Sequence, residues 1–309
     1  MLGGSLSSRL LAVLGLGCTV GAELAEFPSR ENFSRWIGAR ATVLGDYVYV
    51  DGGEISQFVD GVLPKEQWRA GNPVNVTLSI DMSKSWKTND AVLRTIPKSA
   101  MHKSNVVLWT DQAAGVFYSW AGKFPSGVDM IANALWKFTA DGSGGGEWSV
   151  QEPANPALFD SLHTAEFAAY ANTNTTGFAI GGIASGWTEY RRARTQTIPG
   201  MVAFNMQTKE WQNGTTSFSP FDTLVGAAAH YVPSFGPNGL VVVMGGHKAS
   251  LVGEPKISEE PPYDLRNLTM FDPVTKNRYW QTTTGSIPPT PRIHMCTAGF
   301  QSPDGSYEM

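Results

Sequence analysis

The chain has little charge and almost no cysteine. Of its 309 residues, 16% are charged, and 27 acidic side chains against 23 basic ones give a net charge of −4. Such a balance leaves no basic stripe, which argues against nucleic acid as a partner. With 2 cysteines, a disulfide framework of the kind that holds small secreted domains together is excluded.

Long hydrophobic runs are absent after residue 22, so no later segment has the apolar length of a membrane-spanning helix. The first 22 residues contain a basic Arg9, an apolar stretch from Leu10 to Val20 and the small residues Gly21 and Ala22. This layout is typical of a secretory signal peptide. We expect residues 1–22 to be cleaved and the mature protein, residues 23–309, to be secreted or held at the cell surface or cell wall. An uncleaved anchor is the alternative.

Removal of such a peptide would take Cys18 with it and leave Cys296 alone, so no internal disulfide could form. We expect Cys296 to be buried, because it lies in an apolar segment that reads as the first strand of a fifth unit. Five Asn-X-Ser/Thr triplets accompany the signal layout and predict a glycoprotein. Their asparagines are Asn32, Asn75, Asn174, Asn213 and Asn267.

A glycine pair or its remnant recurs four times, and a tryptophan follows each. The pairs are Gly52 and Gly53, Ala121 and Gly122, Gly181 and Gly182, and Gly245 and Gly246. The tryptophans are Trp86, Trp148, Trp211 and Trp280. Gly122, Gly182 and Gly246 lie 36, 34 and 35 residues after Trp86, Trp148 and Trp211. The near-constant interval identifies a repeat protein.

Every unit reads as four short strands. β-Branched and aromatic residues bounded by Gly, Asn and Asp lead into each pair, as in residues 46–50, 115–120, 177–180 and 239–244. A further apolar segment follows a loop, at 78–81, 135–138, 202–205 and 270–273, and the Trp then opens a fourth strand. The pattern predicts an all-β chain.

Four strands per unit, a diglycine after the second and a Trp at the fourth make the chain resemble the kelch-repeat family of β-propellers, and among them fungal secreted or cell-surface members. The resemblance implies four full four-stranded blades, near 33–95, 96–158, 159–220 and 221–288, plus the start of a fifth at 289–309. Kelch units have about 50 residues, whereas successive tryptophans here are 62, 63 and 69 apart. The next glycine pair would fall beyond residue 309, so we expect an incomplete ring and a fragment of a longer protein.

The recurring glycines and tryptophans build the fold and carry no chemistry. Glycine tolerates positive φ and close backbone approach, and a buried Trp fills the gap between neighbouring sheets. Binding is expected instead on the long loops between second and third strands, at 54–73, 123–133, 183–199 and 247–266, which an antiparallel meander places on one face.

Two groups of residues on that face are candidates for binding a protein or glycan ligand. One is the aromatic and basic cluster of the third long loop. The other lies on the chain segments that link successive blades, where kelch-like proteins open onto a central channel. The candidates are Trp187, Tyr190, Arg191, Arg192 and Arg194 in the loop and Arg35, His102, Lys103, His163, Arg292 and His294 in the links. An ordinary solvated loop and histidines bonded only to nearby backbone are the structural alternatives.

The sequence predicts a binding module without a cofactor or metal. The 5 histidines form no close pair, and Cys296 has no marked Tyr neighbour, so the copper centre of a galactose-oxidase-like propeller is not carried by these residues. No nucleophile elbow, phosphate loop or His-Glu metal motif occurs. The alternative is an extracellular oxidoreductase or carbohydrate-active enzyme of the propeller type whose active residues lie partly beyond residue 309. A third possibility, an intracellular kelch adaptor, requires that residues 1–22 are no signal.

Overall fold

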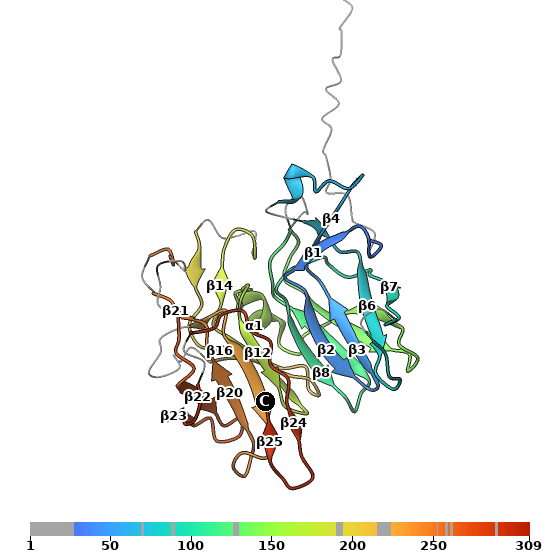
Figure 1. The fold of residues 1–309 in the computed structure, drawn as a ribbon. Helices are drawn as coiled ribbons and strands as arrows, with labels where there is room; N and C mark the ends of the chain where they lie inside the picture. Colours follow the sequence, from blue (N-terminus) through green and yellow to red (C-terminus); the bar gives the residue numbers. More distant parts are fainter. Residues whose placement is uncertain are drawn as a thin grey trace, which may run out of the picture.

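The computed structural model describes residues 28–68, 71–87, 90–125, 130–189, 194–214, 224–251, 253–256, 259, 262–287 and 290–309. The chain is nearly all β, with 43% strand and 4% helix. Four antiparallel sheets of four strands follow one another along the chain, and each has its strands in chain order. The expected four-stranded blades are therefore confirmed (Figure 1).

The four blades begin on the inside with strands β2, β8, β12 and β19. Blade 1 consists of β2 (Arg40–Leu44), β3 (Tyr47–Asp51), β6 (Val76–Asp81) and β7 (Arg94–Pro97). Blade 2 consists of β8 (Val107–Asp111), β9 (Val116–Trp120), β10 (Leu135–Ala140) and β11 (Gly146–Gln151). Blade 3 consists of β12 (Ala169–Asn172), β13 (Thr176–Ile180), β16 (Met201–Asn205) and β17 (Trp211–Gly214). Blade 4 consists of β19 (Ala228–Val232), β20 (Leu240–Met244), β22 (Asn267–Phe271) and β23 (Arg278–Thr282).

Smaller elements lie at one end of the blades. Figure 1 shows β4, β14 and β21 there, in the loops that join the second and third strands of blades 1, 3 and 4. The expectation that these long loops share a face is met. The remaining elements are β1 (Phe33–Ile37), β4 (Glu54–Gln57), the 3-10 helix η1 (Lys65–Gln67), β5 (Asn72–Pro73), α1 (Pro156–Ser161), β14 (Ile183–Ala184), β15 (Gln196–Thr197), β18 (Leu224–Val225) and β21 (His247–Lys248). Among the described residues, no helix has the length and apolar character needed to cross a membrane.

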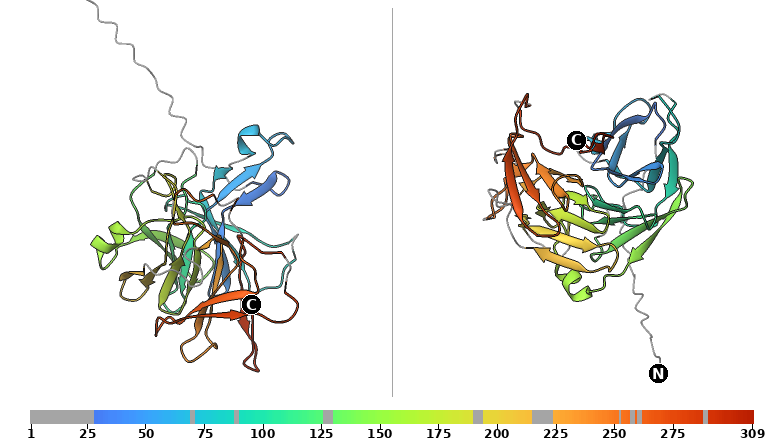
Figure 2. Two further views of the ribbon diagram at one scale, coloured as in Figure 1. Left: turned by 90° about the vertical axis from the view of Figure 1, so that its left-hand side faces the viewer. Right: turned by 90° about the horizontal axis from the view of Figure 1, so that it is seen from below.

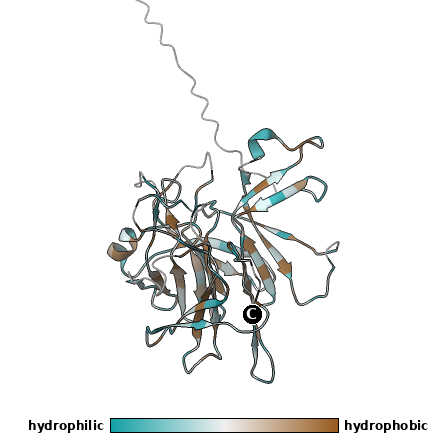
Figure 3. Cartoon of the chain, turned by 60° about the vertical axis from the view of Figure 1, so that its left-hand side comes forward, coloured by the Kyte–Doolittle hydropathy of each residue, from teal (hydrophilic) through white to brown (hydrophobic). Residues whose placement is uncertain are grey.

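The blades radiate from a common axis. The innermost strands β2, β8, β12 and β19 are neighbours in that order, and Figure 2 shows the sheets fanned around the line along which they meet. Apolar residues concentrate along the strands, whereas the loops and η1 are mostly polar (Figure 3). The hydrophobic core is accordingly divided into layers between adjacent blades, such as the one joining Phe178 of blade 3 to Phe271 of blade 4.

The glycine pairs fix how each blade meets the next. Both residues of each pair have positive φ, and Ala121 adopts the same left-handed conformation at φ 58°. The second glycine then donates its N–H to a carbonyl in the link that enters the following blade. These bonds are Gly53 to Lys103 (2.9 Å), Gly122 to Ala165 (3.0 Å), Gly182 to Leu224 (2.9 Å) and Gly246 to Arg292 (2.9 Å). The recurring diglycine is thus an inter-blade connection.

A second repeat, invisible in the residue types, precedes each innermost strand. Gly38, Asn105, Phe167, Gly226 and His294 all have positive φ between 52° and 69°. Hydrogen bonds join Asn105 N to Gly38 O, Gly226 N to Phe167 O and His294 N to Gly226 O at 2.7 to 2.8 Å. A left-handed φ is unfavourable for a bulky side chain such as that of Phe167. The fold, rather than the residue type, therefore sets this conformation where the links pass the axis.

The tryptophan repeat holds in two of the four blades. Trp148 and Trp211 are 8% and 1% exposed, and each faces the preceding blade. The Trp148 indole donates to Thr77 Oγ1 of blade 1 at 3.0 Å. Trp211 contacts Trp109 and Trp120 of blade 2, with ring centroids 5.8 and 4.9 Å apart.

The other two tryptophans correct the sequence interpretation. Trp86 is 41% exposed and lies between β6 and β7 rather than at the start of a strand, since no described blade precedes blade 1 for it to pack on. Trp280 is 61% exposed in the middle of β23. Its expected place opposite the third strand is taken by Arg278, which pairs with Phe271 as Trp211 pairs with Phe204.

A short hairpin follows blade 4 as the start of a fifth unit. It consists of β24 (Phe300–Gln301) and β25 (Tyr307–Glu308). Tyr307 covers an apolar cluster of blade 4, and its hydroxyl lies 2.6 Å from His230 Nε2. Cys296 precedes this hairpin outside any strand and is exposed, so the expectation of a buried cysteine is wrong. The expected strand does not include Cys296, since β24 begins at Phe300.

We predict that Gly181→Ala destabilises the protein more than Gly115→Ala. Both glycines have φ near 65°, but a Cβ at Gly181 would lie 2.1 Å from Leu224 O, whereas one at Gly115 would meet nothing within 4 Å. Gly115→Ala therefore carries only the backbone cost of about 1 to 2 kcal/mol. Denaturant titration of both variants gives the difference, and equal losses would contradict an inter-blade role for the diglycine.

Candidate functional site

A cavity of about 850 Å³ runs along the axis between the innermost strands. Residues of β2, β8, β12 and β19 and the segment 294–299 form its wall. We call it the channel. Its wall combines small apolar residues such as Ala41 and Ala171 with polar groups, among them Thr42, Thr110 and Asn172. A cavity of this volume has the size of a small-molecule site.

Two buried carboxylates lie where the long-loop face meets the blade links. Glu54 begins β4 directly after Gly53 and is 5% exposed. Its Oε1 accepts a hydrogen bond from Ser104 Oγ at 3.3 Å, and its Oε2 is fully buried. Burial raises the pKa of Glu54, and the nearby Lys123 ammonium opposes that rise.

Glu166 is the second of these carboxylates. It is 8% exposed and lies in the link before β12, next to Phe167 of the channel wall. Burial raises its pKa, Lys123 opposes the rise, and the Glu54 carboxylate adds to it. Ser104 bonds to Glu54 through its hydroxyl and bridges Lys123 through its backbone, while Gly122 donates to Ala165 beside Glu166. These bonds place Glu54, Lys123 and Glu166 in one neighbourhood. We call these three residues the mouth cluster.

Lys123 comes from the position directly after Gly122, so the diglycine orients it as it does Glu54. A β-bridge to Ser104 holds its backbone. Its ammonium lies 6.0 Å from the centroid of the Trp187 ring, within range of a cation–π contact. The mouth cluster therefore extends to an aromatic side chain on the surface.

Trp187 is exposed but firmly held. Its indole is 53% exposed, while its backbone N–H donates to Ser185 Oγ at 3.1 Å and its carbonyl accepts the Phe124 N–H at 2.8 Å. An aromatic surface with a fixed backbone loses little entropy when a ligand stacks on it. Of the expected loop cluster, Trp187 and the exposed Arg194 are described, whereas Tyr190, Arg191 and Arg192 lie outside the described residues.

Beside the mouth cluster lie Lys103 and the pair formed by His163 and Glu189. Lys103 is 5% exposed, with its ammonium 4.5 Å from the Phe124 ring. Burial, aided by the Lys98 cation, lowers the pKa of Lys103 to about 8. His163 Nδ1 lies 3.1 Å from Glu189 Oε1 on the surface. Together these groups place several titratable side chains near one another at the long-loop end of the blades.

The other expected link residues do not join this group. Arg35 donates to the carbonyls of Gln67 and Trp68 at 2.7 and 2.6 Å and so fastens the first long loop. His102 Nδ1 bonds to Val74 O at 2.9 Å, and burial lowers the pKa of this imidazole. Both match the structural alternative of a side chain bonded to nearby backbone.

Arg292 and His294 lie at the far end of the described chain. Arg292 is exposed, and its carbonyl accepts the Gly246 N–H. His294 lines the channel, with its ring centroid 4.7 Å from that of Phe167. The structure thus groups Trp187 with His163, places His294 in the channel, and leaves Arg35 and His102 in structural roles.

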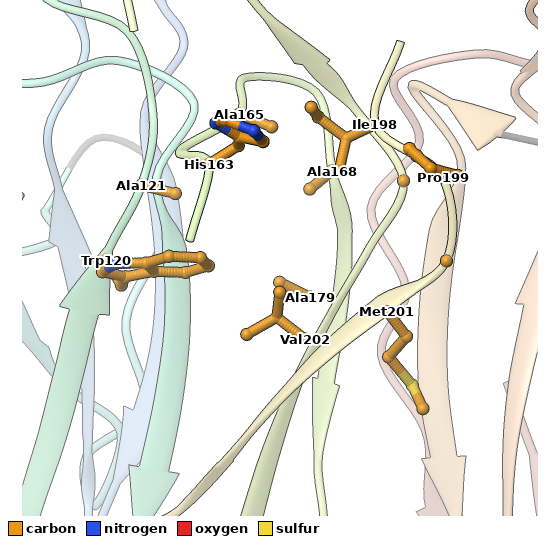
Figure 4. A pocket seen from close by; sticks show the side chains of 12 residues that line it. Trp120, Ala121, His163, Ala165, Ala168, Ala179, Ile198, Pro199, Met201 and Val202 are labelled. Atoms are coloured by element: carbon orange, nitrogen blue, oxygen red, sulfur yellow. The ribbon is translucent and has the colours of Figure 1, made fainter. Parts of the chain in front are cut away.

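A much smaller cavity of about 20 Å³ lies between blades 2 and 3, with His163 at one end and Trp120 at the other (Figure 4). Its other side chains are apolar, among them Ile198 and Val202. It has room for one water but offers few polar partners. We interpret it as a packing gap.

The expected glycosylation sites differ in exposure. Asn32, Asn174 and Asn213 are exposed, whereas Asn75 and Asn267 are half-buried. The side-chain oxygen of Asn75 is fully buried. Within the described ranges, no group of three or more His, Cys, Asp or Glu side chains is arranged to hold a metal ion.

Comparison with known proteins supports the fold alone. No protein-family model and no curated protein matches the chain. A solved structure titled "Structure of YjhT" superimposes with a TM-score of 0.54 at 13% identity, covering 92% of this chain and 81% of the other. At that identity the likeness carries no information on ligand or reaction.

We predict that Glu54→Gln stabilises the protein at neutral pH. Because burial raises the pKa of Glu54 above 4.5, the native state binds the proton more tightly than the unfolded state, and ionisation lowers the stability as pH rises through this range. The gain should therefore disappear below pH 4.5, where the carboxyl is protonated in both states.

Thermal melts across acidic to neutral pH measure this effect. Glu259→Gln serves as the control, because Glu259 is an exposed side chain paired only with Lys256. A Glu54→Gln variant less stable than the parent at neutral pH would contradict the account.

Proposed function

We propose that the protein is a non-catalytic binding module that recognises a glycan at the long-loop mouth of the channel. The observation that supports this most directly is the mouth cluster of Glu54, Lys123 and Glu166 beneath the exposed Trp187. Sugar rings present an apolar face that stacks on an indole, and hydroxyls that bond to carboxylates and ammonium groups.

Rigidity favours binding over a purely structural role. The backbone of Trp187 is held by two hydrogen bonds, and Glu54 and Lys123 follow glycine pairs that are fastened to the next blade. The Ser104 hydroxyl donates to the Glu54 carboxylate at 3.3 Å, which holds this side chain in place before a ligand arrives.

A carbohydrate-active enzyme is the second candidate. Two buried carboxylates whose pKa values are raised by burial are the type of group that serves as proton donor in glycoside hydrolysis. This candidate differs from the first in requiring bond cleavage. The galactose-oxidase-like form of the alternative is not favoured by the described histidines, which do not gather around one point.

Membership of the kelch-repeat family, secretion through residues 1–22 and glycosylation are proposed together. The diglycine bonds in every blade and the Trp positions of blades 2 and 3 support the first. The signal layout and the exposed Asn32, Asn174 and Asn213 support the other two. A cell-surface or cell-wall location is consistent with a glycan ligand.

We predict that Trp187→Ala weakens glycan binding by about tenfold or more, because a stacked aromatic contributes about 1 to 3 kcal/mol to a sugar or base contact. A glycan array with the full chain identifies the ligand, and calorimetry gives the affinity. Trp280→Ala is the matched control, since Trp280 is equally exposed but lies on the outer part of blade 4.

The outcomes separate the candidates. Loss of affinity in Trp187→Ala with no change in Trp280→Ala supports the proposal, and release of free sugar that stops in Glu166→Gln would favour the enzyme instead. If no glycan on the array binds, and the protein instead binds a peptide with an affinity that Trp187→Ala lowers, the ligand is a protein.

We expect the protein made in a eukaryotic secretory host to gain mobility on a gel after treatment with an N-glycosidase. Asn174→Gln should remove one step of that shift because Asn174 is exposed, whereas Asn75→Gln should leave it unchanged because its amide oxygen is buried. A single band before and after treatment would favour the intracellular alternative.

A further inference from the structure

The wall of the channel carries positive charge without any acid to balance it. The described residues that line it include Arg40, His230 and His294, but no Asp, Glu or Lys. Arg40 is therefore the one permanently charged side chain among those described wall residues. An enclosed cation without an anion raises the local potential and attracts negatively charged ligands.

Arg40 has no anionic partner of its own. It begins β2, opposite Asp51 on β3, but Asp51 is already engaged by Lys98 Nζ at 2.8 Å and by Thr77 Oγ1 at 2.8 Å. No hydrogen bond or ion pair joins the guanidinium to any described residue, and its Nε is buried without a partner. A guanidinium without an anion is costly to enclose, so an anion that accepts from its remaining N–H donors would be stabilised.

The surroundings of Arg40 suit an organic molecule that carries a planar anionic group. The guanidinium carbon of Arg40 lies over the ring of Tyr170, 5.9 Å from its centroid. The ring therefore contacts the flat face of the guanidinium and leaves the N–H donors at its edge uncovered. Burial lowers the pKa of His294 and the Arg40 cation lowers it further, so the two side chains share one space in which Arg40 carries the charge. The walls nearby are apolar at Ala41 and Ala171, while Thr42 and Asn172 supply polar atoms.

We propose that Arg40 binds the carboxylate of a small organic acid inside the channel. The fork of a guanidinium matches a carboxylate in a bidentate geometry, which an ammonium cannot do. The cavity of about 850 Å³ accommodates a molecule of sugar-acid size. The site uses none of the three residues of the mouth cluster and does not depend on the glycan proposal.

Calorimetry with the full chain tests the assignment, with glucuronate as the probe, glucose as its neutral counterpart and sulfate as an inorganic anion at equal ionic strength. We expect glucuronate to bind about tenfold or more tightly than glucose and more tightly than sulfate. Arg40→Met should weaken glucuronate binding by about tenfold or more, with Arg40→Lys between it and the parent.

Arg266→Met is the matched control, because Arg266 is exposed and pairs with Asp264 at 3.6 Å on the surface. Thermal melts verify that each variant is folded, and Arg40→Lys keeps the test informative if Arg40→Met is unstable. Trp187→Ala should leave glucuronate binding unchanged, which distinguishes this site from the mouth cluster.

Three results would overturn the proposal. They are equal affinities for glucose and glucuronate, tighter binding of sulfate than of glucuronate, and undiminished glucuronate binding in a folded Arg40→Lys or Arg40→Met variant. Absence of binding by all three probes would overturn it as well.

Discussion

The arrangement of the blades depends on one repeated hydrogen bond, from the second residue of each glycine pair to the link that enters the next blade. The four bonds span 2.9 to 3.0 Å, and each requires two consecutive residues with positive φ. In blade 1 sterics disfavour a side chain there as well as φ, since a Cβ at Gly52 would lie 2.4 Å from Lys103 O, whereas blade 2 accommodates the methyl group of Ala121. The residue that follows the pair is fixed in turn, which is how Glu54 and Lys123 come to face the same opening.

Much of the fold could be predicted from the sequence because strand and turn signals are local. Segments such as 239–244 are apolar runs between short turns, and the glycine pairs can be recognised without knowing which distant residues they contact. The tryptophans were less reliable, because their burial depends on a partner blade. Trp211 has Trp109 and Trp120 to pack against, whereas Trp86 has no such neighbour in the described structure. The prediction that Cys296 is buried was wrong for a related reason. Apolar neighbours in the sequence do not bury a residue unless another strand packs over it.

The candidate site was harder to predict than the fold. Trp187 stood out as an aromatic residue in a long loop, but Glu54, Lys123 and Glu166 are ordinary charged residues separated by more than forty positions each. They come together because the long loops that carry Glu54 and Lys123 meet the blade link that carries Glu166. A signal did exist, since Glu54 and Lys123 each follow a glycine pair in equivalent places. Arg40 carried no signal, because its lack of a partner follows from Asp51 being engaged by Lys98 and Thr77.

The layer of aromatic rings between blades 2 and 3 has a consequence for how the molecule opens. Each described blade is covered mainly by its neighbours along the chain, so blades 2 and 3, which have a described neighbour on both sides, resist local unfolding more than a blade with one. Trp109, Trp120, Phe204 and Trp211 lie at the centre of that array with ring centroids 4.8 to 6.0 Å apart. Amide protons of β9 and β16 would then exchange last, while the β24–β25 hairpin, attached to blade 4 through Tyr307, would fray first. The third long loop, which carries Trp187, connects strands of blade 3, one of the blades that unfold last. A ligand bound to this loop therefore remains bound during local unfolding of other blades.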